Sequence, residues 1–228
     1  TSFKNTNIDG ARFVFANLSN SNLLDRTDLS NINLAGTDLS NVSLKEKNLS
    51  GTMLTGANLT GTILTGADLT GAILKDVDLS GKDLSDTILK DVDLSGKDLS
   101  GTNLAYSDLR LSDLSGTILS DSILLRANLS KIDLRTTKLD NADFRYANLT
   151  ESKLPDSLLV NNNFDHAALN NINFAGKDLS GSSFQQAELD GSDMQNTNLS
   201  SAAFVQVDFT KIKNKSLAGA DLSEASFA

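Results

Sequence analysis

The side chains of this sequence that could do chemistry are carboxylates, hydroxyls and one imidazole. Asp76, Asp78 and Ser80 stand at alternate positions, which is how a calcium loop of the EF-hand kind begins. The twelfth position of such a loop needs a bidentate Glu, and here it is Thr87. We therefore expect no metal site at this segment, nor at its copy that begins at Asp91.

Catalysis needs a convergent set of groups, such as a nucleophile beside a base. The single histidine, His166, lies between Asp165 and Ala167, where we expect a solvent-exposed turn. No serine has a second histidine to activate it, and the absence of cysteine removes thiolate chemistry and disulfides while leaving the redox compartment open. The sequence indicates no catalytic residue and no cofactor, and we expect a protein that is not an enzyme.

Five side chains recur at multiples of twenty residues. Asp93, Asp113 and Asp133 are twenty apart, and Tyr106 and Tyr146 are forty apart. If the backbone returns to the same place every twenty residues, the carboxylates form one outward column and the tyrosines share one corner. Exposed tyrosines often anchor protein interfaces, so these five residues are the candidate interaction surface.

The element that must position these side chains is a repeat of five residues. Leucine or a close substitute occupies every fifth position from Leu29 to Phe209. This period fits neither the 3.6 residues of a helical turn nor the alternation of a strand. The residue two places before each central residue is usually small, and all fifteen glycines lie two places after one. A type II turn puts its second central residue at positive φ, so a tight turn is expected once per unit.

Four such corners close a square, so one coil should take about twenty residues. The phenylalanines support this spacing, because four of them are each twenty apart and would stack as one core ladder. These residues are Phe144, Phe164, Phe184 and Phe204.

Units such as Ala57–Gly61 and Ala67–Gly71 read small residue, Asn or Asp, Leu, Thr, Gly. With such units in tandem over nearly the whole chain, the sequence resembles the pentapeptide-repeat protein family. The resemblance implies an all-β fold, a right-handed quadrilateral β-helix or solenoid. About eleven coils of four pentapeptides would make a rod roughly 50 Å long.

We expect a single domain over residues 1–228 with two irregularities. The step from Leu23 to Leu29 is six residues, which places one extra residue near 24–26. The step from Phe209 to Leu217 is eight residues and holds a Lys-rich insert near 211–216. Four lysines also stand where the repeat favours small residues, and we expect their heads to reach water or a nearby Asp. These are Lys47, Lys82, Lys97 and Lys177.

Charge and hydropathy limit the partners and the location. A net charge of −9 argues against direct nucleic-acid binding, which needs a basic surface. No apolar run approaches the ~18 residues of a membrane span. We expect a soluble protein with the cytoplasm slightly favoured. Because the chain begins at Thr1 without an initiator Met, a removed leader and a secreted or lumenal location stay open.

Three functions compete. The favoured one is a rigid rod that acts as a scaffold or protein–protein interaction module for an unidentified protein partner. One alternative, which the resemblance supplies, is a DNA mimic that binds a topoisomerase such as gyrase. A duplex of ~50 Å would carry about 30 negative charges, far more than the net −9 here. The other alternative is a structural rod that stacks end to end, because uncapped coils leave strand edges unpaired.

Overall fold

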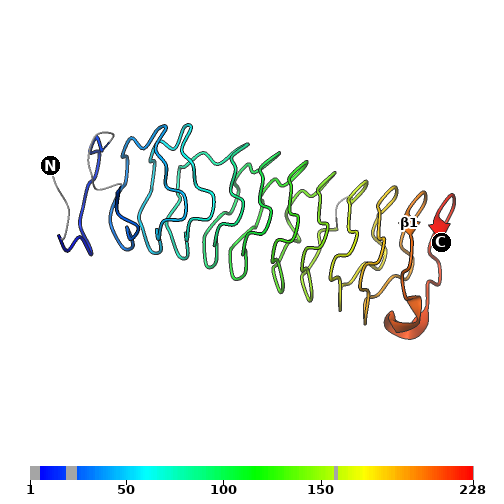
Figure 1. Ribbon diagram of the computed structural model, residues 1–228. Helices are drawn as coiled ribbons and strands as arrows, with labels where there is room; N and C mark the ends of the chain where they lie inside the picture. The colour runs from blue at the N-terminus through cyan, green and yellow to red at the C-terminus, as the bar shows by residue number, and fades with distance from the viewer. Residues whose placement is uncertain (1–5, 19–24, 157–158, 228) are drawn as a thin grey trace.

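The computed structural model describes residues 6–18, 25–156 and 159–227. The backbone is a stack of coils that runs from the N-terminal to the C-terminal end (Figure 1). Neighbouring coils meet through single parallel bridges between residues twenty apart, such as Asp28 with Asn48 and Asn103 with Ile123. Each coil therefore holds four of the five-residue units, as the spacing of the phenylalanines predicts.

Regular elements are few because each side of a coil is extended for only a few residues between two corners. The two strands lie near the C-terminal end and pair in parallel: β1, Ala203–Phe204, and β2, Ser226–Phe227. Two short 3-10 helices lie between them: η2, Phe209–Lys211, and η3, Lys213–Lys215. Elsewhere in the described residues the coils are joined by isolated bridges.

Most described corners are four-residue turns with one residue at positive φ. At the corner of Thr55 and Gly56, Ala57 donates its N–H to the Leu54 carbonyl at 2.8 Å, and Gly56 has φ +63°. The Gly56 N–H donates across to the Lys75 carbonyl of the next coil at 2.9 Å. The corner thus closes its own turn and also ties two coils together.

The core is a set of side-chain columns along the axis of the rod. The central leucines are buried, and the small residue two places earlier shares the interior. Where that residue is Thr, its hydroxyl donates to a backbone carbonyl. For Thr117 this is the Leu94 carbonyl one coil away, at 3.0 Å, and for Thr137 it is the Leu134 carbonyl of its own turn, at 2.6 Å. Four buried phenylalanines stack in one column, with centroids 5.1 to 5.2 Å apart. They are Phe144, Phe164, Phe184 and Phe204.

Two places depart from the offset of twenty. The bridge of Arg12 with Asn33 spans 21 residues, so this coil holds one extra residue. The predicted position of that residue, near 24–26, lies partly outside the described residues, which omit 19–24. At the other end, the bridge of Asn198 with Asp221 spans 23 residues, and η2 and η3 accommodate the insert.

The four lysines at small-residue positions behave differently from the expectation. Their ammonium heads turn back and donate to a backbone carbonyl of the preceding coil. Lys82 uses the carbonyl that a Thr hydroxyl would use, 23 residues earlier. A carboxylate accepts from one of them, Lys177, through Asp156 at 2.7 Å. The carbonyl partners are Arg26 for Lys47, Leu59 for Lys82, Val77 for Lys97 and Pro155 for Lys177.

Among the described residues, no helix has the length and apolar character needed to span a bilayer.

Candidate interaction surface

Four planar side chains occupy the same corner on four successive coils, and we call them the corner ladder: Tyr106, Arg126, Tyr146 and His166. All four have φ between +57° and +61°. Each backbone N–H donates to a carbonyl of the following coil, at 2.7 Å for Tyr106 and 2.9 Å for Arg126. The backbone therefore fixes the spacing of the side chains before any of them meets a partner.

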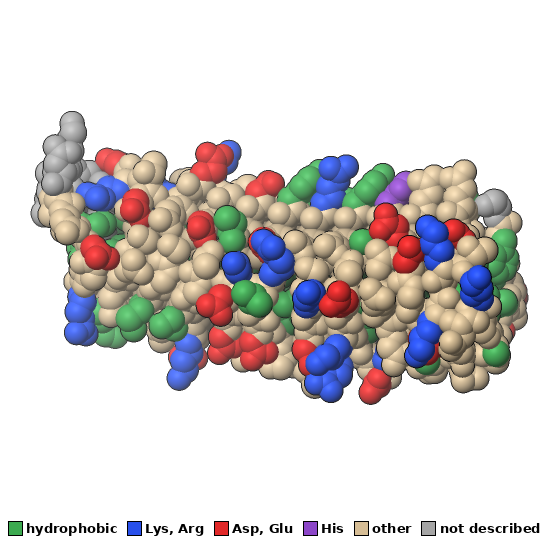
Figure 2. Space-filling model, turned by 90° about the horizontal axis from the view of Figure 1, so that it is seen from below, with side chains coloured by type: hydrophobic (Ala, Val, Ile, Leu, Met, Phe, Trp, Pro, Cys, Tyr) green, Lys and Arg blue, Asp and Glu red, His purple; other side chains and the backbone are tan. Residues whose placement is uncertain are grey.

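The side chains of the corner ladder stack on one another. The Arg126 guanidinium lies 5.7 Å from the ring centroid of Tyr106 and 5.0 Å from that of Tyr146. The rings of Tyr146 and His166 are 4.4 Å apart and nearly parallel, at 2°. Tyr106 and Tyr146 are 51% and 46% exposed, and Figure 2 shows this succession of hydrophobic, basic and histidine side chains along one edge. The order continues with Gln186 and Gln206, whose side-chain amides are hydrogen-bonded to each other.

This arrangement suits recognition. Phenol hydroxyls, a guanidinium and an imidazole offer hydrogen-bond donors in a row along the rod. Stacking between guanidinium and rings contributes about 0.5–1 kcal/mol per contact at an exposed site, so it holds the side chains in one geometry. Ordered side chains lose less entropy on binding, which favours affinity.

Sequence reasoning named two members of the corner ladder and missed two. Tyr106 and Tyr146 lie on one corner two coils apart, where the spacing of forty puts them. Arg126 stands midway between them, and His166 follows by twenty residues. His166 is at a corner, as expected, but its ring is half-buried against Tyr146 rather than free in water. The same spacing, applied to every planar residue, would have found both.

Asp93, Asp113 and Asp133 form a column on another side of the rod, and the backbones of Asp93 and Asp113 pair in a parallel β-bridge. Their first task is local, because each Oδ1 accepts the N–H of the residue two places later. The Ser95 hydroxyl, and then its N–H, lower the pKa of Asp93. A carboxylate committed to its own turn is less available to an outside ligand.

Asp133 is the most strongly held member of this column. The Arg135 side chain makes a two-pronged contact with the Asp133 carboxylate, at 2.9 Å from Nε to Oδ1 and 2.6 Å from Nη2 to Oδ2. Lys153 adds an ion pair at 3.5 Å. The hydrogen bonds from Arg135 hold the pKa of Asp133 well below its ordinary value of 3.8, with Lys153 as a lesser cause. The column is therefore neutralised at this end.

The structure does not bring the tyrosines and the aspartates together. Between Tyr106 and Asp113 the chain passes along one whole side and around the corner at Leu111. The five candidate residues thus lie on two separate surfaces, and the corner ladder is the one with exposed aromatic side chains.

The segment that begins like a calcium loop follows the repeat instead. Leu79 and Leu94 point into the core, and the Asp78 carboxylate accepts from Ser80. Within the described residues, no group of three His, Asp or Glu side chains could hold a metal ion.

Comparison with known proteins identifies the repeat. The sequence pattern of pentapeptide repeats matches over eight copies, which together cover residues 24–81, 83–121 and 124–210. No curated protein matches the chain in sequence.

Several solved structures are similar to the chain. HetL, a pentapeptide repeat protein involved in heterocyst differentiation regulation from the cyanobacterium Nostoc sp. strain PCC 7120, is 30% identical with a TM-score of 0.54. The match covers 94% of this chain and 87% of HetL. Full-length QnrB1, a plasmid-mediated fluoroquinolone resistance protein, is 18% identical over 97% of this chain and 88% of its own, with a TM-score of 0.30. A pentapeptide repeat protein from the Arabidopsis thaliana thylakoid lumen is 19% identical over 76% and 70%, with a TM-score of 0.20.

The matched repeats cover most of the chain, and the likeness to HetL extends over nearly all of it. Both imply that the coils form a right-handed β-helix. The chain belongs to the pentapeptide repeat family.

Proposed function

We propose that this chain is a non-enzymatic, rod-like scaffold whose corner ladder contacts a protein partner. The rod is a single domain over residues 1–228, with four-sided coils, about eleven in number. One observation carries the proposal: Tyr106, Arg126 and Tyr146 are exposed along one edge and, with the half-buried His166, form a stacked row. A surface without a binding role has no need of four planar side chains in register.

The chemistry of the ladder indicates the partner surface. Arg126 is the cation of the ladder, and its guanidinium suits carboxylates bidentately. Tyr and Arg are also the residues most enriched in binding hot spots. We infer a partner that presents acidic side chains with apolar neighbours to this edge.

Corner substitutions that keep the fold can test this function. Asn occupies several corners at positive φ, such as Asn41 and Asn141, so Tyr106→Asn with Tyr146→Asn preserves the backbone. The matched control is Leu111→Asn, at an exposed corner outside the ladder. Each tagged variant is used to capture proteins from native lysate, with quantification by mass spectrometry. A partner retained by wild type and by the control, but reduced at least about tenfold by the double variant, supports the proposal. Equal capture by all three contradicts it.

A DNA mimic that binds a topoisomerase such as gyrase is the second candidate. Outward aspartates recur along the rod, which favours it. Against it, several of them are paired with cations, as in Asp108 with Arg110 and Asp143 with Arg145. Capture of a topoisomerase, with inhibition of its supercoiling by the purified rod, would place this candidate first.

End-to-end assembly is the third candidate. Phe227 of β2 stacks on Phe204 at 5.5 Å, and its own ring is 53% exposed. A second copy seated on this ring would extend the phenylalanine ladder. Assembly of this kind predicts a sedimentation coefficient that rises with protein concentration, and Phe227→Ser should abolish the rise.

A further inference from the structure

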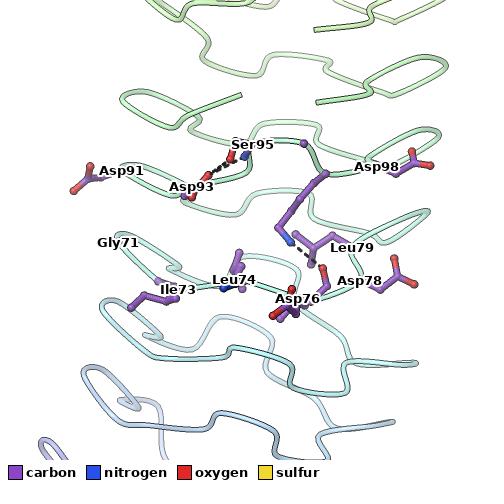
Figure 3. A pocket seen from close by; sticks show the side chains of 15 residues that line it. Gly71, Ile73, Leu74, Asp76, Asp78, Leu79, Asp91, Asp93, Ser95 and Asp98 are labelled. Carbon is purple, nitrogen blue, oxygen red and sulfur yellow. Dashed lines mark hydrogen bonds between the residues drawn. The ribbon is translucent and has the colours of Figure 1, made fainter. Parts of the chain in front are cut away.

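The stack of coils contains an open seam. It separates residues 71–79 from residues 91–98 and forms a groove of about 860 Å³ (Figure 3). Within the continuously described stretch 25–156, backbone hydrogen bonds that join the coils elsewhere are missing here. Leu74 and Leu79 do not donate to the coil above, whereas Leu84, one unit later, donates to the Asn103 carbonyl at 2.8 Å. We call this groove the seam.

The seam leaves strand edges unpaired on both of its walls. In the same stretch of the chain, the N–H groups of Asp93 and Asp98 likewise have no partner in the coil below. On another side the same coils stay joined, with Leu69 donating to the Ile88 carbonyl at 2.8 Å. The seam exposes backbone donors and acceptors of the kind that pair with an added strand. Within the same described stretch, bonds are missing in a similar way below Lys82, where Leu59 and Leu64 do not donate to the following coil.

Lys97 is the wedge that holds the seam open. It occupies a position where the column has Thr117 and Thr137, and its longer side chain reaches across the seam to the other wall. Its Nζ donates to the Val77 carbonyl at 2.9 Å. In other coils the equivalent carbonyl accepts a backbone N–H of the next coil, and here that N–H would be the one of Asp98.

A second lysine in the same column repeats the effect. Lys177 lies four coils further on and donates to the Pro155 carbonyl at 2.8 Å. A smaller groove opens beside it, and the N–H of Leu154, a described residue, has no partner in the next coil. Lys97 and Lys177, two lysines of one column, thus each have an opening below them, whereas Lys47 on another side of the rod does not.

The seam is acidic. Its lining has five carboxylates and two ammonium groups, and Figure 3 shows carboxylates on both walls. None of the five forms an ion pair with any part of the chain that the structure describes. Asp78, Asp93 and Asp98 each use Oδ1 for their own turn, and Oδ2 accepts no hydrogen bond from the described residues. The carboxylates are those of Asp76, Asp78, Asp91, Asp93 and Asp98.

We propose that the seam binds a short, extended, Lys- or Arg-containing segment of a partner protein. The backbone of that segment pairs with the free N–H and C=O groups of the walls, and its cations lie against the carboxylates. Ile73, which is half-exposed, and Val77 supply apolar surface for the intervening side chains. Extended peptides that add to a sheet edge gain affinity through the main chain and specificity through alternate side chains. This site is independent of the corner ladder.

The first test uses a defined probe, a fluorescein-labelled peptide of about eight residues that alternates Lys and Val. Fluorescence anisotropy should show saturable binding. A peptide that alternates Glu and Val, and a Lys–Val peptide with N-methylated valines, should each bind at least about tenfold more weakly. Equal binding of either control peptide overturns the proposal, because charge or backbone pairing is then not required. Absence of binding of the Lys–Val peptide overturns it as well.

The second test alters the wedge. Lys97→Thr places in the column the residue type it holds at Thr117, so the seam should close and the affinity should fall at least about tenfold. Lys47→Thr is the matched control, because Lys47 donates to the Arg26 carbonyl while its neighbour Asn48 still donates to Thr27 at 2.8 Å. This control should bind the probe as wild type does. Retained affinity in Lys97→Thr contradicts the proposal.

A third variant does not depend on closing the seam. Asp93→Asn with Asp98→Asn keeps the turn caps, since Asn fills the same place at Asn103, and should weaken binding several-fold. Hydrogen exchange locates the site: the amides of Leu74, Leu79 and Asp93 should exchange fast and become protected by the probe. Tyr146→Asn should leave probe binding unchanged, so failure of the corner ladder and failure of the seam give different results. Protection elsewhere on the rod overturns the proposal.

Discussion

At the scale of single residues, the aspartates before the central leucines act on their own turns. Asp28 and Asp221 accept the N–H of the residue two places later, as do Asp78, Asp93 and Asp98. These bonds favour the charged carboxylate, so the pKa of each lies below the ordinary 3.8. These aspartates therefore stabilise the turns at the corners as well as supplying negative surface charge.

This role predicts the pH dependence of stability. Because the pKa of these carboxyls is lower in the folded state than in the unfolded chain, their contribution to stability is present above pH 3.8 and is lost as pH falls through the folded pKa. The thermal unfolding midpoint should therefore be steady from pH 7 to about pH 5 and fall below about pH 4. Asp93→Asn, which keeps the cap without titrating, should show a smaller fall than wild type. A midpoint that rises on acidification would contradict this account.

At the scale of the element, the corner is what the sequence predicts best. The five-residue period and the glycines indicated positive φ at one position per unit, and that position has positive φ at most described corners, whether it holds Gly56, Asn41 or Leu111. The β-branched Thr136 is an exception. The stacking of Arg126 between two tyrosines was not foreseen, because it depends on neighbours twenty residues away and on side-chain orientation. The seam was missed for a similar reason: Lys97 fits the repeat by position, and only its length disturbs the coil below.

The corner can be tested at Gly56, where φ is +63° and an added Cβ would meet nothing within 4 Å. Asn tolerates this conformation, so Gly56→Asn should cost less than about 1 kcal/mol. A β-branched side chain does not tolerate it, so Gly56→Val should lower the free energy of unfolding by about 2 kcal/mol. Chemical denaturation of the two variants beside wild type measures the difference. Equal stability of the Asn and Val variants would show that φ is not the constraint at this corner.

At the scale of the whole molecule, each coil contacts only its neighbours. Stability in such a rod is a sum of local terms and interfaces between adjacent coils, and unfolding need not be a single transition. Backbone bonds between coils are sparse at the seam and also on the adjoining sides at Leu59 and Leu64, within the continuously described stretch 25–156. The seam divides the rod into two parts that are joined mainly through the bonds near Leu69 and Leu84.

This division predicts where the effect of a core defect stops. Leu49, which is fully buried on the N-terminal side of the seam, can be replaced by Ala at a cost of about 2–5 kcal/mol. Amide exchange should then speed up in the coils around Leu49 and change little beyond Leu99. Leu139→Ala, an equally buried site on the other side, should have the mirror effect. In a Lys97→Thr background, closure of the seam restores coil-to-coil bonds, so either defect should spread across it. If amide exchange became faster along the whole rod without the Lys97→Thr change, the prediction would be wrong, because the effect of the defect would then cross the seam as it crosses other interfaces between coils.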